Sequence, residues 1–164
     1  MIQQTRSNIG DIFEISLEGE KVYFQYLGKD TEQLGSQVIR VFKRKFPNDF
    51  DPQIDELAAE EPDFHAHVVI QRGIKEGLWK KAGHAKTLNE RFPIRFRRSD
   101  DYGNSSIKVS RNWRVWTHGE AAEHVGQLTT DEQKKAEISP VVPPEYIIER
   151  IKTGKHPFFY PDYE

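Results

Sequence analysis

The chain has 164 residues, and its 24 basic and 26 acidic side chains leave a formal net charge of −2. It contains no cysteine, which excludes disulfides, thiolate metal sites and cysteine nucleophiles. The near-zero net charge gives no overall attraction to nucleic acid or anionic lipid, and the 12% aromatic content is too high for a disordered chain.

The first third predicts an antiparallel meander of three strands. Residues 9–17 alternate in character, with Phe13, Ile15 and Leu17 on one face. A glycine turn at 18–20 leads to an aromatic strand over 22–27. A third strand covers 36–46, and because both of its faces mix apolar and basic side chains, it is expected to be an edge strand or a partly open strand.

The middle of the chain predicts a short helix between further strands. The helix covers 52–60, with Asp51 as its N-cap and Pro52 at its first position. Strands are expected over 64–71 and 92–97. Residues 107–109 are expected to pair with 113–117 across a turn.

The last third changes to helical patterns. Residues 130–137 predict a short helix capped by Thr129 or Thr130, and 144–154 a helix that starts with proline and ends with glycine. We therefore expect an α+β fold. Residues 1–128 would form a β-rich domain, a bent antiparallel sheet or partial SH3-like barrel with short helices. Residues 129–164 would form a helical C-terminal extension that packs on it within a single domain.

The two histidines in His65-Ala-His67 are the sharpest local feature. On a strand, residues i and i+2 point to the same face, so both imidazoles could bind one metal. No second motif with metal-ligand spacing accompanies them. The alternative is two histidines on the polar side of a half-buried strand, which we favour.

Basic and aromatic residues alternate in two segments, 42–46 and 91–98. Such alternation can bind nucleic acid, here through Lys43, Arg44, Arg97 and Arg98, but it is also typical of a half-solvated strand. Neighbouring aspartates would repel phosphates, so no nucleic-acid binding is expected.

Carboxylates gather between the predicted helix and the fourth strand. This acidic segment comprises Asp55, Glu56, Glu60, Glu61 and Asp63. It can be a solvated helix face or a docking surface for a basic partner, and Trp79 is a candidate anchor nearby. We predict a partner-binding surface here.

The opening strands resemble a known family. Gly10-Asp11 with the strand to Leu17, the aromatic strand ending at Gly28, and the strand 38–42 resemble the start of the immunity protein 26 family, predicted antidotes of bacterial polymorphic toxins. Gly77-Leu-Trp79-Lys-Lys-Ala-Gly83 matches a later Gly-x-Trp-x-x-x-Gly element of that family. The resemblance spans residues 9–84 at most.

The resemblance implies a bacterial binding protein that neutralises a cognate toxin domain by direct contact. We accordingly expect a cytoplasmic protein with a protein partner, no catalytic residues, no cofactor and no membrane association; no signal peptide or apolar span is visible. Two alternatives stay open. One is a small nucleic-acid-binding barrel. The other is a metal-dependent hydrolase using His65 and His67, since some family members carry a phosphotriesterase label.

Overall fold

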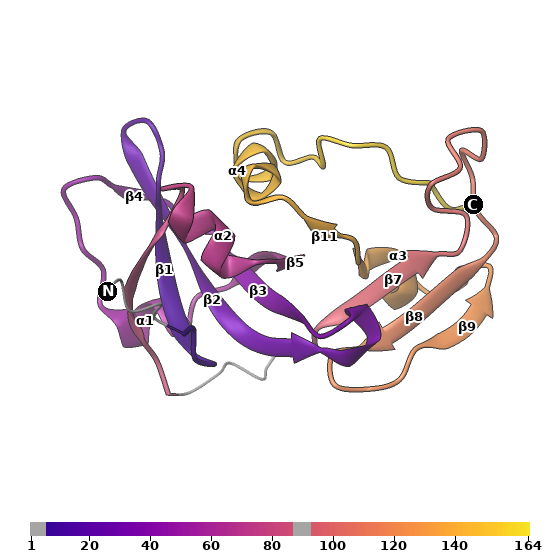
Figure 1. Ribbon diagram of the computed structural model, residues 1–164, viewed down its shortest axis with the longest axis horizontal. Coiled ribbons are helices and arrows are strands. Elements are labelled where there is room, and N and C mark those ends of the chain that lie inside the picture. The colour runs from indigo at the N-terminus through magenta and orange to yellow at the C-terminus, as the bar shows by residue number, and fades with distance from the viewer. Residues whose placement is uncertain (1–5, 87–92) are drawn as a thin grey trace.

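The computed structural model describes residues 6–86 and 93–164. They form two sheets joined side by side, with the C-terminal tail running from α4 back to the smaller sheet (Figure 1). The predicted α+β class, with bent sheets and short helices, is confirmed.

The larger sheet contains seven strands in the order β11-β5-β3-β2-β1-β6, with β4 pairing beside β2. Its strands are β1 (Asp11–Ser16), β2 (Glu20–Asp30), β3 (Ser36–Phe42), β4 (Phe46–Pro47), β5 (Pro62–Val68), β6 (Lys80–His84) and β11 (Val141–Val142). Within the described residues its end strands β11 and β6 do not pair, so this sheet is bent and open rather than a closed barrel.

The smaller sheet has four strands in the order β10-β7-β8-β9. These are β7 (Arg95–Ser99), β8 (Trp113–Thr117), β9 (Glu123–Gly126) and β10 (Glu137–Ile138). The helices are the 3-10 turn η1 (Thr31–Gln33), α1 (Ile54–Ala58), α2 (Ile70–Lys75), α3 (Asp131–Lys135) and α4 (Pro144–Thr153).

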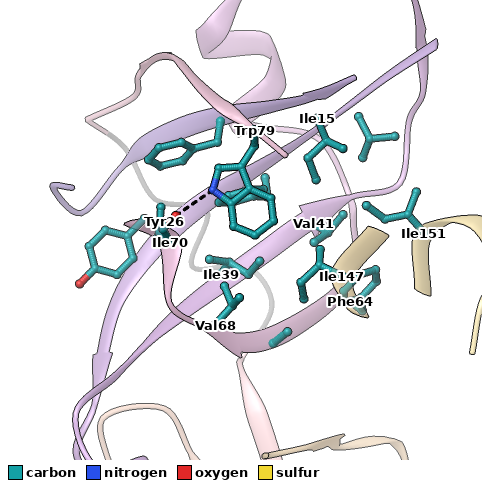
Figure 2. Close-up of a cluster of buried hydrophobic side chains, with 14 of the residues drawn as sticks. Ile15, Tyr26, Ile39, Val41, Phe64, Val68, Ile70, Trp79, Ile147 and Ile151 are labelled. Carbon is teal, nitrogen blue, oxygen red and sulfur yellow. Dashed lines mark hydrogen bonds between the residues drawn. The ribbon is translucent and has the colours of Figure 1, made fainter. Parts of the chain in front are cut away.

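The main core lies on one face of the larger sheet (Figure 2). Phe13 and Phe24 pair across β1 and β2, with their rings stacked 5.0 Å apart. Trp79 meets the Phe24 ring edge-on and donates a hydrogen bond to the Ile70 carbonyl at 3.0 Å. α4 closes this core with Ile147 and Ile151, which lie four residues apart on one face of the helix.

The two sheets meet where β2 continues past the predicted end of its strand. Gly28, at φ +120°, lies at a shift in the β2–β3 register, and this backbone region favours glycine. Beside this register shift, Leu27 and Val38 of the larger sheet pack against Phe96 and Trp116 of the smaller one. We call this contact the junction.

The C-terminal segment belongs to both sheets. β10 pairs in parallel with β7 of the smaller sheet, and β11, three residues later, pairs in parallel with β5 of the larger one. Residues 129–164 therefore include two short strands besides the two expected helices. The tail packs back, as expected, through a parallel bridge between Asp162 and Val109.

Several local predictions were wrong. β3 is an interior strand that pairs with β2 and β5. Its Arg40 can be buried there because the guanidinium donates hydrogen bonds to Gln25 and to the Ala58 carbonyl. Residues 107–109 do not pair with β8, which lies between β7 and β9.

The start of one helix and the end of one strand also differ from the predictions. α1 begins after Gln53, and the proposed cap Asp51 instead accepts a hydrogen bond from Lys21 at 2.6 Å. Helix α2 replaces the end of the predicted strand 64–71.

None of the helices in the described ranges is long and apolar enough to cross a membrane.

Candidate functional site

The acidic segment runs from α1 into the start of β5. Asp55, Glu56, Glu61 and Asp63 are exposed, and Glu60 is partly buried. α1 is held against the body by Leu57 and Ala58, which are buried in a second core cluster with Phe42 and Phe46. The helix thus has an anchored apolar side and a solvated acidic side.

The five carboxylates fall into two groups. Glu60 pairs with Arg44 at 3.1 Å and Glu61 approaches Lys43 at 4.0 Å, so the basic residues after β3 neutralise this part of the segment. Asp55, Glu56 and Asp63 have no basic partner within 4.0 Å in the described part of the chain. These three charges are the ones available to another molecule.

Trp79, the predicted anchor, lies inside the molecule. Its side chain is 4% exposed and belongs to the main core described above. A buried indole that packs edge-on against Phe24 cannot contact a partner while the fold is intact. Its hydrophobic contribution therefore goes to stability.

The basic residues of the nucleic-acid hypothesis are separated between the sheets. Lys43 and Arg44 face the acidic segment, as above. Arg97 stacks on the Trp113 and Tyr163 rings and donates to the Ala136 carbonyl at 2.9 Å. Arg98 lies over Trp116 and donates to the Glu32 carbonyl. All four guanidinium or ammonium groups therefore have contacts within the chain.

The two histidines of the predicted pair have different surroundings. His67 is fully buried at the junction, where its Nε2 lies 2.8 Å from Asp30 Oδ2. The same Asp30 oxygen accepts the Trp116 indole N–H at 3.0 Å. Burial lowers the pKa of His67 despite the nearby carboxylate, while these hydrogen bonds keep the pKa of Asp30 below its ordinary value against the effect of burial.

His67 is thus a neutral ring that donates through Nε2 to an ionised carboxylate. This contact ties β5, β2 and β8 together. Among residues 6–86 and 93–164, no group of three or more His, Asp or Glu side chains is placed to hold a metal.

His65 lines a cleft at the boundary between the two sheets. The cleft has a volume of about 260 Å³. One wall is the start of β5, and the others come from β7, α3 and the residues that follow it. Its lining residues are Pro62, Asp63, Phe64, His65, Pro93, Arg95, Asp131, Glu132, Lys135, Ala136 and Glu137.

The local sequence explains why α3 forms a wall of this cleft. Thr130 Oγ1 accepts a hydrogen bond from the Gln133 N–H at 3.2 Å, and Gln133 Oε1 accepts one from the Thr130 N–H at 3.3 Å. This capping box starts the helix, as predicted for Thr130. β10 then begins at Glu137 and pairs with β7, which fixes α3 beside Arg95.

Two titratable groups in the cleft have shifted pKa values. Burial, together with the positive charges of Arg40 and Arg150, lowers the pKa of His65 to about 4, so the ring is neutral at pH 7. Burial raises the pKa of Glu137, even though Arg150, which contacts it at 2.9 Å, favours the charged form.

Sequence reasoning found Asp63 and His65 but missed the opposite walls of the cleft. Arg95, Asp131, Glu132, Lys135 and Glu137 lie at least 30 residues further along the chain. No spacing motif connects them to β5, because the parallel pairings of β10 and β11 bring them there. Their charges alone gave no signal of this proximity.

Comparison of the chain with family models, with curated proteins and with solved structures finds no match to any of them.

Proposed function

We propose that this protein is a binding module that neutralises a toxin domain by direct, stoichiometric contact, as an immunity protein does. The observation that carries the proposal is the set of unpaired, exposed carboxylates Asp55, Glu56 and Asp63 on an anchored helix and the strand after it. A preformed acidic surface attracts a basic partner over long range and complements it on contact.

The resemblance of residues 9–84 to the immunity protein 26 family supports the choice of a toxin as the partner. Many toxin domains are nucleases whose clefts are basic to hold phosphates. An acidic surface can occupy such a cleft and exclude the nucleic acid. The protein would then need neither a cofactor nor catalytic residues.

The test pairs the protein with a toxin domain encoded beside it. We expect a one-to-one complex of the purified proteins and protection of cells that express the toxin. Failure of every neighbouring toxin domain to bind would contradict the proposed function.

A charge-reversal variant tests the surface. In Asp55→Lys/Glu56→Lys, we expect the affinity for that toxin to fall by about tenfold or more at low salt, and the difference to shrink as salt screens the charges. The control, Glu18→Lys/Glu120→Lys, makes the same change in net charge at exposed positions outside the acidic segment. If both variants bind equally well, the interface lies elsewhere.

A further inference from the structure

The size of the cleft beside His65 limits what it can hold. Pockets for small ligands and cofactors typically enclose about 300–1,000 Å³. At about 260 Å³, this cleft lies below that range. The space suits one inserted side chain better than a cofactor.

The charges that line the cleft are only partly balanced. Glu132 pairs with Arg95 at 3.5 Å, and Glu137 pairs with Arg150 at 2.9 Å. Asp63, Asp131 and Lys135 have no ion-pair partner within the described ranges. Among the lining residues, pairing leaves two carboxylates against one ammonium group, which favours a cation; Arg40, whose charge also acts on His65, does not line the cleft.

His65 supplies a second, independent feature. Its ring lies mostly inside the protein, lines the cleft, and has no hydrogen-bond partner in the part of the chain that the structure describes. A neutral imidazole has one nitrogen with a free lone pair. A guanidinium or ammonium group, which carries donors and no acceptor, can satisfy that lone pair.

The remaining lining matches the stem of a basic side chain. Pro62, Phe64 and Pro93 provide apolar surface in the same cleft. Arginine and lysine bury their methylene groups on such surface while the charged end reaches polar groups. Asp63 is also the last residue of the acidic segment, so the cleft opens beside the proposed docking surface.

We propose that this cleft receives an arginine side chain of the protein partner, with Asp63 and Asp131 pairing with the guanidinium and His65 accepting one of its hydrogen bonds. The identity of the occupant rests on the proposed function, whereas the preference of the cleft for a guanidinium does not.

The test uses the full chain and a small probe, so it does not depend on finding the toxin. Agmatine, which carries the arginine side-chain group, is titrated at low ionic strength while NMR follows the His65 ring signals. Inorganic phosphate is titrated in parallel, because Arg95 and Lys135 would favour an anion. We expect agmatine, and not phosphate, to shift the His65 signals in a saturable way.

Matched variants test which carboxylates bind the agmatine guanidinium. Asp63→Asn and Asp131→Asn are expected to weaken agmatine binding by about fivefold to tenfold. Asp49→Asn makes the same charge change at an exposed position outside both the cleft lining and the acidic segment, and is expected to leave binding unchanged. The unperturbed signals of the main core show that each variant is folded.

Three results would overturn the proposal: saturable binding of phosphate at His65, no saturable shift with agmatine, or equal weakening in Asp49→Asn and Asp63→Asn. If agmatine binds at His65 but no toxin binds the protein, the proposed function fails and the cleft assignment stands. If a toxin binds and agmatine does not, the reverse holds.

Discussion

At the junction, Asp30 accepts hydrogen bonds from three donors on three segments of the chain. They are His67 Nε2 at 2.8 Å, Trp116 Nε1 at 3.0 Å and the Glu32 N–H at 3.1 Å. The carboxylate is 1% exposed, so water cannot replace it when it is removed. This single side chain therefore stabilises the contact between the two sheets.

We predict that Asp30→Ala lowers the free energy of unfolding by about 3 kcal/mol or more, because it leaves buried donors unsatisfied. Urea denaturation at pH 7 measures the change. The control Asp49→Ala removes an exposed carboxylate and is expected to change stability by less than about 0.5 kcal/mol. Equal effects of the two substitutions would contradict the role of Asp30.

Leu34 shows the opposite case, a residue that the fold tolerates at a cost. It has φ +56° in the turn between η1 and β3, and its side chain is 100% exposed. A non-glycine residue in this backbone region is strained by about 1 kcal/mol, and a fully exposed side chain makes no packing contact that offsets this strain.

Leu34→Gly is therefore expected to raise the free energy of unfolding by roughly 0.5 kcal/mol, since relief of the strain exceeds the added entropy of the unfolded chain. Leu34→Ala keeps the backbone strain and removes the side chain, so its stability should match the wild type. If Leu34→Gly is less stable than Leu34→Ala in urea denaturation, relief of the backbone strain does not exceed the added entropy of the unfolded chain.

At the scale of elements, Gly73 shows how packing overrides helix propensity. It lies within α2, where alanine would ordinarily favour the helix. A Cβ at this position would lie 2.0 Å from Trp79 Cζ2, and Trp79 is fixed between Phe24 and the Ile70 carbonyl. Helix and indole can meet only without a side chain at this position.

Gly73→Ala is predicted to destabilise the protein by about 2 kcal/mol, although propensity alone predicts a gain of about 1 kcal/mol. The control is Gly77→Ala. A Cβ at Gly77 would meet no atom within 4 Å, so this substitution adds only the backbone strain of an alanine at φ +72°. Urea denaturation with tryptophan fluorescence checks both. A stability for Gly73→Ala above the wild-type value would show that Trp79 can move aside.

The sequence predicts elements whose signals are local. The structure confirms the predicted cap at Thr130 and the predicted ends of α4, with Pro144 at its start and Gly154 after its last turn. β3 was misread, because alternation of Arg40 with apolar residues is typical of an edge strand. Burial of that guanidinium depends on Gln25 and Ala58, 15 and 18 residues away, which no local pattern reveals.

The candidate site divides in the same way. The acidic segment is continuous in sequence and could be predicted, but its pairing with Lys43 and Arg44 could not. The cleft exists because β10 and β11 pair in parallel with strands of different sheets. Parallel pairing over two residues leaves almost no trace in the sequence.

At the scale of the whole molecule, stability should depend on pH through three histidines that are buried or partly buried. Burial is the main cause that lowers the pKa of both His65 and His156 from 6.5 to about 4, and it also lowers the pKa of His67. The unfolded chain therefore binds these protons at a higher pH than the folded protein does. Stability is then fully present above pH 6.5 and is lost as the pH falls toward 4.

Carboxylates do not produce a loss in the upper part of this window. The pKa values of Asp11, Glu14, Asp30 and Asp51 are lowered from ordinary values of 3.8 or 4.5, so their contributions disappear only at lower pH. Glu137 acts in the opposite direction: its pKa is raised from 4.5, so the folded state takes up that proton first and regains some stability. Between pH 6.5 and about 5 the histidines dominate.

We predict that the free energy of unfolding falls by about 2 kcal/mol or more between pH 7 and pH 5, an order-of-magnitude value for these buried or partly buried histidines. His65→Gln/His156→Gln removes two of these groups and should reduce the slope of the profile to the part that His67 contributes, whereas the exposed His124→Gln should leave the profile unchanged. Urea denaturation across this pH range makes the comparison. A double variant whose profile keeps the wild-type slope would show that the protons bind elsewhere in the molecule.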